Sequence, residues 1–476
     1  MGKSLMFDAR SRMPVAASEL FAWHAREGAF ERLAPPWESV EVLERSGDGI
    51  REGARLVLRT RIGPVAPRWE ARHTKYIEGS LFQDEQVSGP FARWVHTHRF
   101  WPEPPSSSVL EDEVVYTPPM GVAGRAFGGG IIRRKLERMF AYRHAVTRED
   151  LRRHAAFSGQ GPLTVAVTGS TGLIGGALVP FLTTGGHRVR RLVRGRPNAE
   201  RGDVAWNPAK GELDVAALEG VDAVVHLAGE NVAQRWTPQA KESILRSRTE
   251  GTRVLCEGLA RLQKKPKVLV CLTGTGFYGN RGDELLTEVS APGEGFLASV
   301  CLEWEAATAA AEEAGIRVVH LRTGVVLDAR GGALAKMVPP FLMGGGGPVG
   351  GGQQWMSWIA LEDVVGLTHF ALFTPELRGP VNGVSPQAVR QGDFARTLGR
   401  VLSRPAVFPL PAAAVRALFG EMGKETLLTG AHVSPELAER HGYPFMLPEL
   451  ESALRFTLGR TTQGLQFTHG PAPEQP

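Results

Sequence analysis

Cysteine is scarce: the 476 residues include only Cys256, Cys271 and Cys301, and no two of them form a CxxC spacing. Three such cysteines cannot build a disulfide framework or a structural zinc site, so we expect a reducing, cytoplasmic compartment. The chain also lacks any run of about 18 apolar residues, the length that a membrane-spanning helix requires. We therefore predict no membrane span.

A strong excess of charge is missing as well. The 55 Lys and Arg against 50 Asp and Glu give a net charge of +5, so we predict no nucleic-acid partner. Hydrophobic residues make up 42% and charged residues 22%, which is typical of globular proteins. The length exceeds that of one ordinary core, so we expect at least two domains.

A short turn-forming segment, Ser-Gly-Gln-Gly-Pro at residues 158–162, predicts a linker. It would join a first domain at 1–157 to a second at 163–404, followed by a C-terminal region at 405–462. Residues 463–476 offer little to bury, so we expect a disordered tail.

The first domain has the pattern of an antiparallel sheet closed by a long helix. An extended run at its start and a short helix-like segment come first, and a glycine-rich hinge at 128–130 precedes apolar residues at helical spacing, including Leu136 and Phe140. Turn residues separate segments rich in β-forming residues, which predict strands at 55–62, 69–77, 81–87, 91–101 and 109–116.

This order of elements, with the phrase P-V-A-A-S-E-L-F-A-W, resembles the START-like (SRPBCC, cyclase/dehydrase-type) fold over residues 4 to about 154. The resemblance implies an α+β helix-grip domain, a curved sheet wrapped around the long helix. Such folds commonly enclose an apolar cavity, which would take a hydrophobic ligand. A filled core would produce the same pattern of aromatic residues, so both readings stay open.

Three histidines of the first domain, His73, His96 and His98, stand at strand spacing. No carboxylate or cysteine motif accompanies them. We therefore expect ordinary histidines of a sheet and predict no metal.

The second domain opens with an apolar strand at 163–167 that runs into T-G-S-T-G-L-I-G. Gly169 permits a tight turn, Gly172 lets the backbone approach a pyrophosphate, and Gly175 lets the following helix pack closely on the sheet. The helix N-terminus adds free N–H groups and a favourable dipole. We predict an α/β Rossmann-type doubly wound parallel sheet. Its turn would contact a dinucleotide through Gly169, Ser170, Thr171, Gly172, Leu173, Ile174 and Gly175.

The second strand of this domain, at 188–193, ends at Arg194, where NAD-specific sites place an acidic residue. Arg194, with Arg196 nearby, could hold a 2′-phosphate, so the position favours NADP over NAD; a solvated arginine is the alternative. A later apolar strand ends in small residues up to Gly229, which lets a nucleotide pass close to it.

Five ordered motifs resemble the extended short-chain dehydrogenase/reductase (SDR) superfamily: T-G-S-T-G-L-I-G, V-V-H-L-A-G-E-N, L-T-G-T-G-F-Y-G, L-R-T-G-V-V-L and W-I-A-L-E-D-V. Further phrases such as C-L-E-W-E and R-P-A-V-F-P-L-P are similar to its atypical, epimerase-type members. That likeness runs from residue 163 to about 458 and includes a C-terminal region of unknown function. Fusion to a START-like domain also resembles an arrangement found in that family.

The resemblance implies cofactor contacts from the glycine turn, Arg194, Leu227, Ala228, Glu242 and Arg248. Arg248 stands where ordinary extended members carry Asn in an N-x-x-G-T pattern. Its cation could pair with Glu242 or reach the cofactor, and a surface ion pair is the alternative.

An ordinary SDR combines Tyr-x-x-x-Lys with a Ser or Thr for proton transfer. In L-T-G-T-G-F-Y-G, Thr275, or Thr273, can supply the hydroxyl, and Tyr278 lies close by; packing at a strand end is the alternative. We predict Thr275 and Tyr278 as the catalytic residues.

The helix that should carry Tyr-x-x-x-Lys reads G-F-L-A-S-V-C-L-E-W-E. Leu297 and Cys301 take the two positions, or Phe296 and Val300 in a register shifted by one, so the dyad is absent. We interpret Cys301 as a small buried residue, since no cation or histidine in the motif activates it. The helix's glutamates, Glu303 and Glu305, could be acid–base groups, although such residues usually face water.

Three hypotheses follow. The first is an NADP(H)-dependent oxidoreductase or epimerase-like enzyme for an unidentified small molecule. The alternative is a non-catalytic, NADP(H)-responsive binding protein coupled to the START-like domain and its hydrophobic ligand. The third is lipid or polyketide handling by the START-like domain, with the Rossmann domain as a scaffold.

Overall fold

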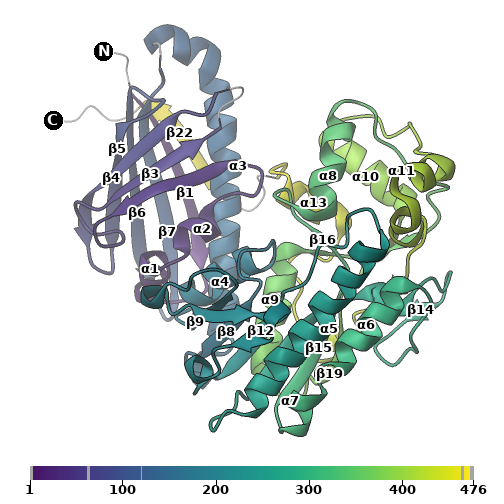
Figure 1. Cartoon of the computed structure of the whole chain (residues 1–476). Helices are drawn as coiled ribbons and strands as arrows, with labels where there is room; N and C mark the ends of the chain where they lie inside the picture. The colour runs from purple at the N-terminus through teal and green to yellow at the C-terminus, as the bar shows by residue number, and fades with distance from the viewer. Residues whose placement is uncertain (1–3, 62–64, 120, 462–465, 472–476) are drawn as a thin grey trace. The chain divides into compact units, whose positions relative to one another are not determined.

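The computed structural model describes residues 4–61, 65–119, 121–461 and 466–471 (Figure 1). Its contacts define two compact units. The first unit comprises Met1–Gly159, Thr183–Gly186 and Leu458–Pro476, and the second unit comprises Gln160–Leu182 and His187–Thr457. No helix among the described residues is long and apolar enough to cross a membrane.

The first unit is built on one antiparallel sheet in the order β2-β3-β4-β5-β6-β7-β1-β22. Alternating apolar residues direct one face of each central strand into the core, as expected for a half-buried sheet. The strands are β1 (Leu5–Met13), β2 (Val40–Ser46), β3 (Arg55–Thr60), β4 (Arg68–Ile77), β5 (Leu81–Ser88), β6 (Arg93–Glu103), β7 (Ser107–Thr117) and β22 (Gln466–Pro471).

Three helices pack on this sheet: α1 (Ala17–Ala25), α2 (Ala29–Leu33) and the long α3 (Gly121–Ala155). Leu136 and Phe140 of α3 bury their side chains against Phe7 and Val114 of the sheet. This arrangement confirms the START-like fold. The predicted hinge at 128–130 is wrong, because these residues lie inside α3; glycine costs a helix only about 1 kcal/mol relative to alanine.

The predicted disorder of the tail is wrong for residues 466–471, which form β22. This strand pairs antiparallel with β1, from Leu5 opposite Pro471 to Arg10 opposite Gln466. Without β22, β1 would be an edge strand with unpaired N–H and C=O groups. Hydrogen bonds to these groups stabilise an ordered strand in this polar segment. The other residues of the predicted tail lie outside the described part of the chain.

The second unit contains a largely parallel sheet in the order β11-β10-β9-β8-β12-β13-β15-β19, with only β11 antiparallel. The order reverses between β8 and β12, which is where doubly wound sheets bind ligands. This confirms the predicted Rossmann-type fold. The strands are β8 (Thr164–Thr168), β9 (Arg188–Val193), β10 (Val204–Asn207), β11 (Glu212–Leu213), β12 (Ala223–His226), β13 (Val268–Gly274), β15 (Arg317–Thr323) and β19 (Gly379–Gly383).

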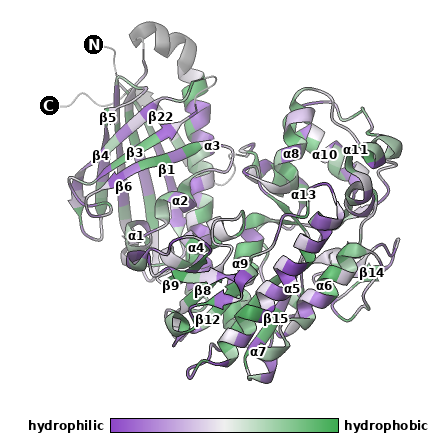
Figure 2. Ribbon diagram, viewed as in Figure 1, coloured by the Kyte–Doolittle hydropathy of each residue, from purple (hydrophilic) through white to green (hydrophobic). Residues whose placement is uncertain are grey.

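Helices cover this sheet. On α5, hydrophilic residues dominate the part that faces away from the sheet (Figure 2), while Ile244, Leu255 and Leu259 are buried. The helices are α4 (Gly175–Thr184), α5 (Pro238–Ala260), α6 (Phe296–Ala306), α7 (Ala309–Glu313) and α9 (Leu361–Phe373).

The remaining chain of the second unit forms helices and short two-stranded ladders. These are α8 (Gly332–Leu342), α10 (Gln391–Leu402), α11 (Ala412–Thr426), α12 (Glu436–Arg440) and α13 (Leu450–Thr457), with β14 (Leu285–Leu286) beside β21 (His432–Val433), β16 (Val325–Leu327) beside β18 (Trp358–Ala360), and β17 (Trp355–Met356) beside β20 (Val389–Arg390).

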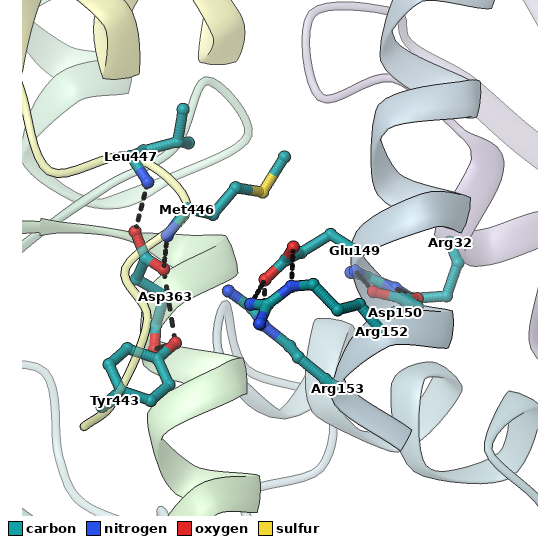
Figure 3. A network of polar contacts seen from close by, with 9 residues as sticks. All are labelled: Arg32, Glu149, Asp150, Arg152, Arg153, Asp363, Tyr443, Met446 and Leu447. Atoms are coloured by element: carbon teal, nitrogen blue, oxygen red, sulfur yellow. Dashed lines mark hydrogen bonds and ion pairs between the residues drawn. The ribbon is translucent and has the colours of Figure 1, made fainter. Parts of the chain in front are cut away.

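Within the second unit, Asp363 in the first turn of α9 forms hydrogen bonds to the C-terminal region (Figure 3). Its carboxylate accepts the backbone N–H groups of Met446 at 2.8 Å and Leu447 at 2.9 Å, and the Tyr443 hydroxyl donates to its carbonyl at 3.0 Å. Within the first unit, Figure 3 also shows the buried ion pair of Arg32 with Asp150, which joins α2 to α3.

Candidate dinucleotide-binding site

The turn after β8 is built so tightly that two of its glycines cannot carry a side chain. Gly169 has φ of +63°, and a Cβ there would lie 2.9 Å from the carbonyl carbon of Leu227. A Cβ on Gly175 would overlap the carbonyl oxygen of Gly169. A Cβ on Gly172, in contrast, would meet only that same oxygen, at 3.3 Å. The turn is thus packed on its inner side and free of protein beside Gly172, where a phosphate would lie.

A buried chain of hydrogen bonds joins the ends of β8 and β12. The Thr168 hydroxyl accepts the N–H groups of Leu227 at 3.0 Å and Ala228 at 3.1 Å, so its own proton is left for His226 Nδ1 at 2.8 Å. His226 Nε2 then donates to the Thr252 hydroxyl at 3.0 Å. Burial lowers the pKa of His226 to about 4, so the ring is neutral. This network holds Leu227 and Ala228, two predicted cofactor contacts, next to the glycine turn.

Arg194 is the exposed arginine at the end of β9. Two arginines of the strand are engaged, since Arg190 donates to the carbonyl of Ala217 and Arg191 forms an ion pair with Asp203, while Arg188 at the opposite end of the strand is exposed. Within the described ranges, Arg194 has no such partner. It lines a pocket of about 520 Å³ together with Val193, Gly195, Ala205, Trp206, Asn207 and others from β10 and β11. A cation without a partner therefore stands where the second strand ends.

Arg248 points inward from α5. It donates to the carbonyls of Glu230 at 2.9 Å and Ile244 at 3.1 Å, and its guanidinium lies 4.9 Å from the centre of the Trp304 ring. A Cβ on Gly229 would come within 3.1 Å of that guanidinium, so Arg248 lies directly beside the end of the predicted nucleotide-binding segment.

The expected pairing of Arg248 with Glu242 is wrong. Glu242 is 64% exposed and instead faces Arg246, at 3.6 Å. Glu242 and Arg248 are six positions apart, which corresponds to about 240° around a helix, so the two side chains leave α5 on different faces. The structure does not bring Glu242 to the glycine turn.

The structure places Tyr278, one of the two residues predicted to be catalytic, inside the protein. It closes a short helical turn, Thr275–Tyr278, and its side chain is fully buried. Its hydroxyl donates to Asn382 Oδ1 at 2.7 Å and accepts from Arg322 Nη1 at 3.0 Å, and burial raises its pKa. In this arrangement the hydroxyl is engaged by Asn382 and Arg322 and does not reach solvent.

The two threonines of this motif differ. Thr273 donates to the carboxylate of Glu305 at 3.2 Å, so its hydroxyl is already used. Thr275 is half-buried, and its hydroxyl has no hydrogen bond to the part of the chain that the structure describes. Thr275 is therefore the hydroxyl at the end of β13 that remains available to a ligand.

On α6, Leu297 and Cys301 occupy the face that turns toward the end of β13. A Cβ on Gly276 would lie 3.1 Å from Leu297 Cβ, and the Cys301 thiol lies 3.6 Å from the Gly274 carbonyl. The other register, Phe296 and Val300, packs with Trp236 beside α5. Burial raises the pKa of Cys301 to about 11, so its thiol stays protonated. Neither position supplies an acid–base group.

Sequence reasoning missed an ion pair under this part of the sheet. Glu305 of α6 and Arg322 of β15 form a two-pronged contact at 2.8 and 2.7 Å, with side chains only 11% and 5% exposed. Glu305 therefore does not face water, the usual orientation of a charged residue on a helix. The signal was an arginine inside the apolar strand L-R-T-G-V-V-L, since a buried cation requires an anion on a neighbouring element.

The fold and this site define an extended Rossmann protein of the SDR class joined to a START-like unit. Family models match all three parts of the chain. Residues 165–382 match the NAD dependent epimerase/dehydratase family, residues 410–457 a domain of unknown function (DUF1731), and residues 13–140 the polyketide cyclase / dehydrase and lipid transport family.

An epimerase family protein of Mycobacterium bovis is 43% identical over 297 residues, which cover 62% of this chain and 98% of that protein. The human epimerase family protein SDR39U1 is 37% identical over 297 residues, covering 62% of this chain and 99% of the human protein. The chain therefore belongs to the NAD dependent epimerase/dehydratase family.

Solved structures extend the similarity to both units. The nucleoside-diphosphate sugar epimerase of Corynebacterium glutamicum is 31% identical with a TM-score of 0.78, covering 95% of this chain and 90% of that one. Human SDR39U1 (isoform 2), solved with NADPH, is 34% identical with a TM-score of 0.58, covering 63% of this chain and all of that one.

Proposed function

We propose that the chain binds NADP(H) at the glycine turn after β8 and that Arg194 recognises the 2′-phosphate. The observation that carries this proposal is the exposed cation at the end of β9, at the position where NAD-specific sites place an acid. The structure of the human relative with NADPH supports the same cofactor. Leu227, Ala228 and Gly229 would border it, and Arg248 would hold the segment that contains them.

We further propose an oxidoreductase or epimerase-like reaction on a small molecule at the end of β13. The bound cofactor would supply or accept a hydride there. The Thr275 hydroxyl would orient the substrate by a hydrogen bond. Leu297 and Cys301 at the place of the usual dyad would supply no acid–base group, so any proton transfer would use solvent or a group of the substrate.

The alternative function is a non-catalytic, NADP(H)-responsive binding protein. It is favoured by the replacement of both dyad positions by apolar or neutral side chains and by the occupied hydroxyl of Tyr278. In that case cofactor binding would be coupled to a ligand of the START-like unit, and the coupling would be reciprocal. The hydrophobic ligand and the domain bounds derived from the sequence remain predictions.

The cofactor proposal is tested by titrating the full chain with NADPH and NADH and following nicotinamide fluorescence. Arg194→Glu should weaken NADPH at least tenfold and leave NADH nearly unchanged, since a carboxylate repels the 2′-phosphate but accepts from ribose hydroxyls. Arg253→Glu, the same charge change on the exposed face of α5, is the matched control. Equal losses for both dinucleotides would refute the role of Arg194.

Turnover separates the two functions. The wild-type chain is incubated with NADPH and a panel of carbonyl compounds and nucleotide sugars. Oxidation of NADPH that Thr275→Val slows at least tenfold, with NADPH affinity unchanged, would support the enzyme. Tight NADPH binding without turnover across the panel would support the binding protein.

A further inference from the structure

The concave face of the first unit's sheet contains a cluster of histidines and carboxylates. His96 and His98 lie on β6, with Asp84 on β5 and Asp112 on β7 as neighbours across the sheet. Asp84 is directly opposite His96, and Asp112 is directly opposite His98. The two histidines and Asp112 are buried, while the Asp84 side chain keeps 18% of its surface exposed. The register of three strands thus assembles groups that are scattered in the sequence.

Asp112 orients the rings around it. Its Oδ1 lies 2.8 Å from His96 Nε2 and 2.6 Å from His98 Nδ1, and its Oδ2 accepts from His144 Nε2 at 2.7 Å. His96 Nε2 must carry hydrogen in this bond, because a carboxylate only accepts, and a neutral His96 then keeps its lone pair on Nδ1. His98 Nδ1 is buried and forms no hydrogen bond, although it lies close to Asp112 Oδ1.

In the described part of the chain, no donor forms a hydrogen bond with His96 Nδ1. His96 Nδ1 faces Asp84 Oδ2 at 3.6 Å, a distance too long for a hydrogen bond and one that sets two acceptors against each other. Asp84, His96 and His98 each bring one ligand atom within 4.8 Å of the others. A metal ion about 2.1 Å from each of two ligands at a tetrahedral angle separates them by about 3.4 Å. The spacing of His96 and Asp84 is close to that value.

The composition of the cluster points the same way. Its carboxyl groups come from two strands, Asp84 from β5 and Asp112 from β7, and Arg143 of α3 interacts electrostatically with both. A divalent cation between Asp84 and the two rings would interact favourably with this pair of carboxylates.

We propose that Asp84, His96 and His98 bind a divalent transition-metal ion of the zinc class, with Asp112 as the residue that positions both rings. Two imidazoles and one carboxylate suit such an ion and leave a coordination position for water or a ligand. A carboxylate that holds the far nitrogen of a metal-binding histidine is a common supporting contact. Our prediction of no metal rested on the missing carboxylate motif; the carboxylates come from the two adjacent strands.

The test uses the full chain, freed of metal with a chelator and titrated with zinc and with cobalt(II). We expect one equivalent of each to bind and the cobalt form to show the intense visible absorption of a four- or five-coordinate ion. Asp84→Asn and His98→Gln should each weaken zinc at least tenfold, and Asp112→Asn by about 10- to 100-fold. Asp48→Asn, which removes a carboxylate that is 85% exposed in the same unit, should change nothing.

Equal zinc affinity in the wild type, Asp84→Asn and His98→Gln would overturn the site, because it would place any bound ion elsewhere. A cobalt spectrum of the six-coordinate aqueous type, or no binding, would overturn it on the wild type alone, even if a variant fails to fold. Either result would assign the cluster to a hydrogen-bonded network without metal. NADPH affinity, measured in parallel, is independent of this outcome, so failure here leaves the cofactor proposal intact.

Discussion

Two ends of neighbouring strands in the same parallel sheet are built in opposite ways. At β8 and β12 the backbone forms the surface: Gly169 and Gly175 leave no room for side chains, and the space beside Gly172 is free of protein. At β13 and β15 the side chains fill the space, with Tyr278 enclosed and Glu305 paired to Arg322.

The difference teaches that the two halves of the candidate site depend on different parts of the chain. A dinucleotide is held largely by backbone geometry, which requires the glycines. Acid–base chemistry requires particular side chains that reach a substrate, whereas Tyr278, Glu305 and Arg322 lie in buried polar contacts in this structure. We call the strand ends at β8 and β12 the open end and those at β13 and β15 the filled end. The following predictions treat the open end as a binding surface and the filled end as structural.

The largest effect should come from Arg322→Met, which would break the ion pair at the filled end. Glu305 and the Tyr278 hydroxyl would lose their cation inside the protein, and we expect the free energy of unfolding to fall by about 3–5 kcal/mol in urea titrations. Arg246→Met, at an exposed pair on α5, should change it by less than about 0.5 kcal/mol. A loss below about 1 kcal/mol for Arg322→Met would show that the filled end is not structural.

Gly172→Val probes the open end. The side chain would meet little protein, so the fold should persist, but it would occupy the place of the pyrophosphate; we expect NADPH affinity to fall at least 100-fold, equivalent to about 2.7 kcal/mol. Fluorescence titration measures the affinity, and circular dichroism checks the fold. Gly176→Ala, at the second residue of α4 where a Cβ would meet no protein atom within 4 Å, is the control. Retained affinity in Gly172→Val would move the proposed site away from this turn.

The contrast between the two ends also explains what the sequence could predict. The strand, glycine turn and helix of the open end are contiguous from Thr164 to Thr184, so periodicity and spacing identify them. The positions of the usual dyad, Leu297 and Cys301, could also be located from the sequence, because they belong to a local motif. The START-like order of elements was visible for the same reason.

The filled end could not be read in this way, because its contacts join residues that are far apart. Tyr278 bonds to Asn382, 104 residues later, and only the packing of β19 beside β15 brings them together. β22 likewise pairs with β1 across nearly the whole chain. Local propensity predicts neither of these pairings, because both depend on tertiary packing.

A smaller effect should follow from pH at the open end. Burial lowers the pKa of His226 from 6.5 to about 4, so the unfolded chain binds a proton between these values and the folded chain does not. Stability is therefore fully present above pH 6.5 and lost as the pH falls toward 4. From pH 7 to pH 5 the loss from this residue should be about 2 kcal/mol. His226→Gln should show a shallower pH dependence in urea unfolding; identical slopes would mean that His226 is protonated in the folded state.

The smallest effect should come from Tyr278→Phe, which decides most directly between a structural and a catalytic filled end. The substitution keeps the ring and removes the hydroxyl that donates to Asn382 and accepts from Arg322, so we expect a loss of about 1–2 kcal/mol in the free energy of unfolding. NADPH affinity should stay within twofold, since the buried hydroxyl reaches neither the glycine turn nor solvent. Any NADPH turnover found with the wild type should also persist, with an unchanged pH profile.

Thr275→Val is the matched control for the stability measurement, because it removes the neighbouring hydroxyl that has no bond to the described chain and should cost little stability. If Tyr278→Phe instead abolished turnover while stability and affinity were kept, the tyrosine would have to become exposed during the reaction, and the filled end would be catalytic.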